Sequence, residues 1–77
     1  MQIDTQALRR ARLQAGMSLR ALGHAAGIAH DTVMYIERGS QNPHPGTVKK
    51  LADALGLTVD DLVDWEAEGL EPGKVAA

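Results

Sequence analysis

Four glycines divide this chain into short stretches, and each stretch repeats its apolar residues with the period of an α-helix. The glycines are Gly16, Gly27, Gly39 and Gly56. Glycine just after the last apolar residue of such a stretch is the usual end of a helix. No alternation of apolar and polar residues predicts a strand, and no internal repeat is present. The pattern therefore predicts an all-α fold built from short helices.

Apolar spacing and capping residues predict five helices. The first has Leu8, Ala11 and Ala15 inward and Asp4 or Thr5 as its cap, and the second is a short helix, Leu19–Ala26, after the cap Ser18. The third is Ala29–Arg38, and the fourth runs from Gly46 or Thr47 to Leu55. The last is a short helix after Thr58 that carries Leu62 and Val63. The inward residues of the third and fourth helices are Ile28, Val33 and Ile36, then Val48, Leu51, Ala52 and Leu55. The Gly- and Pro-rich run 39–46 predicts a loop. We expect a compact five-helix domain.

Length and composition agree with a single small domain. The chain has 77 residues and no cysteine, so its core must come from aliphatic side chains rather than from disulfides. No apolar run approaches the roughly 20 residues that span a bilayer, and residues 1–4 lack the layout of a secretion signal. A cytoplasmic protein without membrane contact is expected.

The charges are unevenly distributed along the chain. Residues 1–57 hold seven basic and four acidic side chains, or +3, whereas residues 58–77 hold six acidic side chains and Lys74, or −5. The two values sum to the formal net charge of −2. A mildly basic module is compatible with a nucleic-acid partner even though the whole chain is acidic. We expect residues 1–65 to form the domain and residues 66–77 to form an acidic, flexible tail that is frayed over residues 69–77.

Two short helices joined by a Gly-containing turn, with a helix on either side, are typical of a helix-turn-helix. The residues that strengthen this reading are Ala15-Gly16-Met17-Ser18, Leu22, Ala26-Gly27-Ile28, Thr32-Val33, Ile36-Glu37-Arg38-Gly39, Asn42-Pro43 and Leu51 to Leu57. In this order and spacing they resemble the Cro/cI-type helix-turn-helix (XRE) family over roughly residues 5–63. The resemblance implies that Ser18–Ala26 is the positioning helix and that Ala29–Arg38 is the recognition helix, which enters the major groove of DNA.

The resemblance also assigns candidate base contacts. His30, Asp31, Thr32 and Tyr35 occupy the positions that reach base edges in family members. Thr32 can donate, accept or touch a thymine methyl group, Asp31 can accept from cytosine N4, and His30 can donate to a guanine acceptor. Each side chain could instead be merely solvated, and the Tyr35 ring could pack on a neighbouring helix.

Phosphate contacts are expected at helix starts and from exposed cations, because amides and the helix dipole favour anions. The polar candidates are Ser18, Gln41, Asn42 and Thr47, and the cationic candidates are Arg20 and Arg38. Arg9 and Arg10 could as easily be a solvated face, and simple solubility is the better explanation for Lys49 and Lys50.

Arg12 and Glu37 match a family pair that forms a largely buried ion pair between the first helix and the end of the recognition helix. The resemblance therefore gives Glu37 a structural role. No nucleophile–base pairing accompanies this carboxyl group, so no enzymatic activity and no cofactor are expected. His24, His30 and His44 do not share a helical face, so no metal site is expected either.

Two positions depart from the family pattern. Leu19 stands where many relatives carry a phosphate-contacting glutamine, and it could lie at the groove edge or pack against the first helix. Ala29 stands where Ser or Thr usually caps the recognition helix. Leu62, Trp65 and Leu70 are the apolar candidates for a dimer contact, although Trp65 could instead cap the core of the monomer.

The sequence thus predicts a DNA-binding transcription regulator, and a repressor in particular. Its expected partners are double-stranded DNA and a second copy of the chain in a weak or DNA-induced dimer. The alternative is an antitoxin-like or other protein-interaction subunit that binds DNA only secondarily. Low basicity, Leu19 and the acidic tail favour that alternative, and salt-sensitive DNA binding by the chain alone would exclude it.

Overall fold

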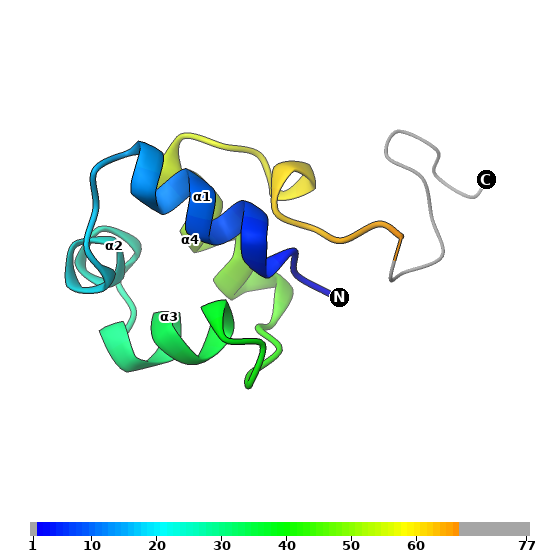
Figure 1. Cartoon of the computed structure of the whole chain (residues 1–77), viewed down its shortest axis with the longest axis horizontal. Coiled ribbons are helices and arrows are strands. Elements are labelled where there is room, and N and C mark those ends of the chain that lie inside the picture. Colours follow the sequence, from blue (N-terminus) through cyan, green and yellow to red (C-terminus); the bar gives the residue numbers. More distant parts are fainter. Residues whose placement is uncertain (1, 67–77) are drawn as a thin grey trace.

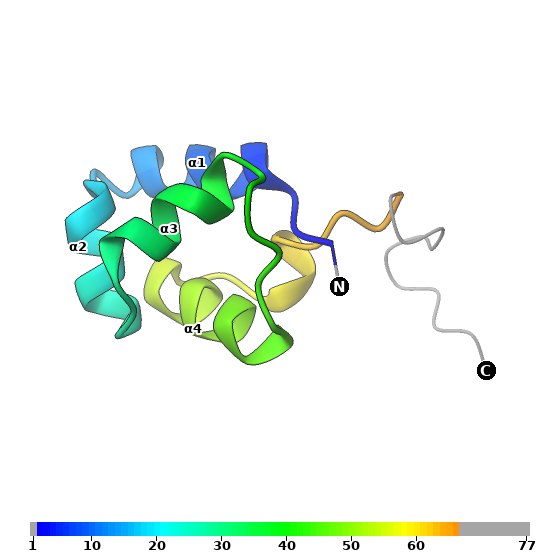
Figure 2. The same cartoon turned by 90° about the horizontal axis from the view of Figure 1, so that it is seen from below.

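The computed structural model describes residues 2–66, which fold into four α-helices and one short 3₁₀ turn. The elements are α1 (Thr5–Gln14), α2 (Leu19–Ala26), α3 (His30–Glu37), α4 (Pro45–Leu55) and the 3₁₀ turn η1 (Val59–Asp61). α3 lies on one side of both α1 and α4 (Figure 1), and in Figure 2, which views the domain from below, it runs across the front with α2 at one end of the domain. None of these helices has the length and apolarity needed to cross a membrane. The described part of the chain is all-helical, as the sequence predicts.

The prediction of a fifth helix after Thr58 is wrong, because only the single 3₁₀ turn η1 forms there. The Asp61 carboxylate folds back to accept hydrogen bonds from Thr58 N and Oγ1, each at 3.0 Å. Residues 62–64 then run beside the N-terminal segment. Val63 forms an isolated antiparallel bridge with Ile3, and Asp4 N donates to Leu62 O at 2.7 Å. Pairing with a distant segment keeps Leu62 and Val63 out of a helix.

The helix starts also refine the predicted boundaries. Asp4 caps α1, since its Oδ1 accepts from Gln6 N and Ala7 N at 3.1 and 3.0 Å. Ala15 lies at the C-cap of α1 and is exposed, so its predicted place on the inner face is wrong. The fourth helix begins at Pro45, before the predicted Gly46 or Thr47. Proline suits the first turn of a helix because its fixed φ is helical and its missing N–H has no partner there.

The core is aliphatic and joins all four helices. Its largest fully buried side chains are Leu8, Leu22, Val33, Ile36, Val48, Leu51 and Leu62. Ile28, Leu55 and Leu19 are partly buried and pack against this cluster. Leu19 is half-buried and packs against this cluster, which favours inward packing over an exposed position at the groove edge.

Candidate nucleic-acid interface

A three-residue turn, Gly27–Ala29, joins α2 to α3. Gly27 has a φ of 71°, a left-handed conformation that glycine adopts without strain. Ile28 N donates to Gly23 O at 2.9 Å, and Gly27 N donates to His24 O at 3.2 Å, so the turn closes back on the last turn of α2. These bonds fix where α3 begins relative to α2 (Figure 1).

Gly23 is a residue whose importance the sequence reasoning missed. A Cβ at this position would lie 2.8 Å from Ile28 O, a distance that real Cβ atoms essentially never show, and 3.1 Å from His30 N, which is also tight. The absence of a side chain lets the turn pass directly over α2. A glycine inside a helical pattern is the signal that could have indicated this close approach.

The outer face of α3 carries the four predicted base contacts. His30, Asp31 and Tyr35 are exposed and Thr32 is half-buried, whereas Val33 and Ile36 on the inner face are fully buried. The Tyr35 side chain is 44% exposed, which favours the alternative in which its ring is available to a partner. His30 Nε2 lies 3.1 Å from Asp31 Oδ1, so these two polar groups already contact one another.

The start of α3 has no side-chain cap. Ala29 occupies the N-cap with the extended backbone of a capping residue (φ −64°, ψ 141°). Ala29→Ser should therefore raise the free energy of unfolding by about 0.5–2 kcal/mol, because the new hydroxyl accepts from an amide of the first turn. Urea denaturation followed by circular dichroism measures the change. Ala29→Val, which adds side-chain atoms without a hydrogen-bond acceptor, is the control and should give no such gain; a gain no larger for serine than for valine would contradict the prediction.

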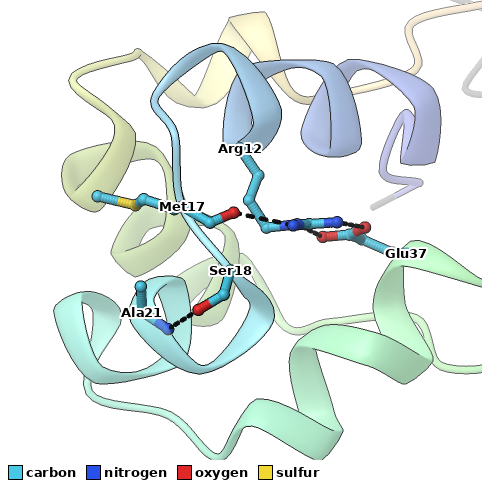
Figure 3. A network of polar contacts seen from close by, with 5 residues as sticks. All are labelled: Arg12, Met17, Ser18, Ala21 and Glu37. Atoms are coloured by element: carbon cyan, nitrogen blue, oxygen red, sulfur yellow. Dashed lines mark hydrogen bonds and ion pairs between the residues drawn. The ribbon is translucent and has the colours of Figure 1, made fainter.

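Ser18 provides the corresponding cap for α2. Its Oγ accepts from Ala21 N at 3.0 Å (Figure 3). A hydroxyl that accepts one hydrogen bond still has a proton to donate. Ser18 can therefore hold the helix start and donate to an anion at once.

Arg12 and Glu37 form the ion pair that the resemblance implied (Figure 3). Arg12 Nε donates to Glu37 Oε2 at 2.6 Å, and Nη2 donates to Oε1 at 3.0 Å. The remaining nitrogen, Nη1, donates to Met17 O at 2.9 Å. The two side chains are only 11% and 9% exposed. One guanidinium group thus ties α1 to the end of α3 and to the linker that precedes α2.

A basic hollow of about 240 Å³ opens beside this ion pair. It is lined by Arg9, Arg12, Leu19, Met34, Glu37 and Arg38. Three guanidinium groups against one carboxylate leave a formal charge of +2, which favours an anion at its mouth. The hollow includes Arg38, a phosphate contact predicted from sequence, and Arg9, for which the sequence left open a phosphate contact or a solvated face. Arg9 could not be selected from sequence because the hollow is formed only when α1 packs beside α3.

The remaining predicted phosphate contacts are spread more widely. Gln41 and Asn42 are exposed in the loop after α3, and Thr47 is half-buried in the first turn of α4. Arg20 is exposed near the start of α2. The loop lies at the opposite end of α3 from α2 (Figure 1), so these candidates do not form one cluster.

Among the predicted dimer contacts, Leu62 is fully buried in the core, so its assignment to a dimer contact is wrong. Its backbone pairs with Asp4, which draws the side chain inward. Trp65 is half-buried, and its indole Nε1 is buried without a hydrogen-bond acceptor among the described residues. Leu70 lies outside the described residues.

Comparison with known proteins agrees with this geometry. The helix-turn-helix domain family matches residues 6–65. The HTH-type transcriptional regulator DdrOP3 of Deinococcus deserti is 37% identical over 57 residues, which are 74% of this chain and 44% of DdrOP3. The restriction-modification controller protein C.AhdI of Aeromonas hydrophila superimposes with a TM-score of 0.72 at 32% identity, covering 74% of this chain and 86% of C.AhdI.

The biofilm regulator SinR is similar in two solved structures. In complex with DNA it superimposes with a TM-score of 0.72 at 30% identity, covering 75% of this chain and 97% of SinR. In complex with SinI the TM-score is 0.75 at 32% identity, covering 88% of this chain and 67% of the other.

The chain belongs to the helix-turn-helix domain family, in its Cro/cI-type (XRE) form. It spans less than half the length of DdrOP3 and about a fifth of the length of three mycobacterial HTH-type regulators that it also matches.

Proposed function

We propose that this chain binds duplex DNA by inserting α3 into the major groove, and that it thereby regulates, and specifically represses, transcription in the cytoplasm. The observation that carries the proposal is the outer face of α3. It exposes His30, Asp31 and Tyr35 on a helix whose inner face is fully buried. Side chains of this kind can donate to and accept from base edges. A domain bound over a promoter in this way would exclude other proteins from it, which is the proposed route to repression.

The basic hollow supplies the proposed phosphate contact. Arg9 and Arg38 are exposed at its rim, while Arg12 is held by Glu37. Ser18 adds a hydroxyl proton close to the first residue of α2.

Salt dependence tests the proposal. With Arg9, Arg20 and Arg38 as phosphate contacts, the logarithm of the association constant should fall with the logarithm of salt concentration with a slope of about −3 per chain. Arg38→Gln should weaken binding to every sequence and reduce the slope by about 1. Lys50→Gln, on exposed α4 surface, is the matched control and should leave the slope unchanged. Binding that is absent or insensitive to salt would contradict DNA recognition by the chain alone.

A protein-interaction subunit is the second candidate function. Its support is the outer face of α1, where Leu13 is 56% exposed beside Arg9 and Arg10. SinR, which this fold resembles, forms complexes both with DNA and with SinI. Under this alternative the chain alone lacks salt-sensitive DNA affinity and gains it only with its partner.

Dimerisation and the absence of enzymatic activity remain part of the proposal. With Leu62 buried, Trp65 is the described residue proposed for a weak or DNA-induced dimer contact. Both carboxylate oxygens of Glu37 accept from Arg12, so this carboxylate is occupied by a structural bond and is a poor candidate for acid–base chemistry.

A further inference from the structure

The outer side of α1 presents a basic stripe with an apolar centre. The α1 stripe consists of Gln6, Arg9, Arg10, Leu13 and Gln14, which line one shallow surface hollow. All five side chains are exposed, and Leu13 is one of two large hydrophobic residues exposed among residues 2–66. Within this part of the chain, no carboxylate forms an ion pair with Arg9 or Arg10. The stripe therefore has two free cations and an apolar side chain to offer a partner.

The chain itself contains a segment of complementary chemistry. Beyond Glu66 the sequence reads Ala-Glu-Gly-Leu-Glu, so that Glu68 and Glu71 flank Leu70. The two acids and the leucine are complementary in charge and polarity to two arginines that lie one helical turn before Leu13. The match has the composition needed for ion pairs at the edges of a small apolar contact.

The path of the chain brings this segment within reach of the stripe. Asp64 N donates to Gln2 O at 2.8 Å and Asp4 N donates to Leu62 O at 2.7 Å, which hold residues 62–64 against the start of α1. In Figure 1 the described chain leaves the domain on the side where α1 begins. Four extended residues beyond Glu66 span about 14 Å. Glu66 lines one surface hollow with Asp4, and the nine residues from Asp4 to Leu13 rise about 14 Å along a helix. A fully extended segment 67–70 that starts beside Asp4 therefore just spans the stripe.

We propose that residues 67–77 dock on the α1 stripe, with Glu68 and Glu71 paired to Arg9 and Arg10 and with Leu70 against Leu13. Arg9 lines both the stripe and the basic hollow beside Arg38. The docked segment and a DNA phosphate therefore compete for the same guanidinium group. A short tether holds the segment at an effective concentration on the order of millimolar, so even a weak contact is populated. The regulatory part of this inference rests on the proposed function, whereas the docking itself does not.

A spin label tests the docking without DNA. The chain has no cysteine, so Gly73→Cys accepts one label at a single position. At low salt the label should broaden the amide signals of Arg9 to Gln14 on α1 more than those of Lys49 and Lys50 on α4. Broadening should disappear in Glu68→Gln/Glu71→Gln and in Arg10→Gln/Leu13→Ser, and it should persist in Lys50→Gln. The proposal would be overturned if α1 and α4 broadened equally, or if the broadening survived the loss of the two acids. It would also be overturned if the label broadened α1 only in a second, isotope-labelled copy of the chain and not in the chain that carries the label.

A DNA titration then tests the competition. Glu68→Gln/Glu71→Gln should raise the affinity for a random-sequence duplex about fivefold at low salt. Asp53→Asn/Asp60→Asn removes the same charge from exposed positions elsewhere and is the matched control. A gain of equal size in the control would overturn the competition, because net charge alone would then account for it. If no variant binds DNA, the proposed function fails while the label experiment still decides whether the segment docks.

Discussion

Glu37→Gln is expected to remove about 3–5 kcal/mol from the free energy of unfolding, because it leaves the largely buried Arg12 charge without its carboxylate partner. The Arg12 side chain is 11% exposed, and Glu37 accepts from two of its nitrogens. A chain of 77 residues has about 4–12 kcal/mol of stability in total. The variant should therefore be marginally folded at room temperature, and urea denaturation followed by circular dichroism measures the loss.

Two further variants distinguish the buried pair from ion pairs in general. Asp53→Asn breaks the exposed pair with Lys49, whose side chains are 59% and 63% exposed, and should cost less than about 1 kcal/mol. Arg12→Met/Glu37→Met replaces both charges by apolar groups and should be more stable than either single substitution, since no charge is left unpaired. A loss below about 1 kcal/mol in Glu37→Gln would mean that this pair does not hold α1 to α3.

Gly23→Ala is expected to lower the free energy of unfolding by about 1–3 kcal/mol, the usual cost of forcing extra atoms into a packed site. The added Cβ would lie 2.8 Å from Ile28 O, which is backbone and cannot rotate away. The turn between α2 and α3 would have to move, so the chemical shifts of Ile28 to Asp31 should change as well. Chemical denaturation gives the stability, and an amide spectrum gives the local displacement.

Gly46→Ala is the matched control for this substitution. Gly46 lies in the first turn of α4, where a Cβ would meet nothing within 4 Å. Alanine is favoured over glycine in a helix by about 0.5–1 kcal/mol, so this variant should be neutral or more stable. If Gly23→Ala behaved like Gly46→Ala, the close approach of the turn to α2 would not be a constraint on the fold.

The local signals in the sequence predicted the four α-helices well. Glycines mark where each helix ends, and Ser18 caps α2 as predicted. The prediction failed where a distant segment decides the conformation. Thr58 and two aspartates read as the start of a helix, but residues 62–64 pair with residues 2–4 and only one 3₁₀ turn forms. Leu62 is buried for the same reason.

The candidate interface was predictable to the extent that it lies on one element. His30, Asp31 and Tyr35 lie on the exposed side of α3, which helical periodicity alone can place. The basic hollow takes Arg9 from α1 and Arg38 from the end of α3, so it exists only in the packed domain. Gly23 likewise matters through its approach to a turn and not through its place in α2.

Selection of binding sites from random duplex DNA tests most directly whether the outer face of α3 reads DNA sequence. The purified chain at low salt should enrich one motif, with two-fold symmetry if a dimer binds. Thr32→Ala and His30→Ala should each relax the preference at separate base positions while keeping the salt dependence. Enrichment of no motif, or of one motif that is unchanged in both variants, would contradict recognition by α3.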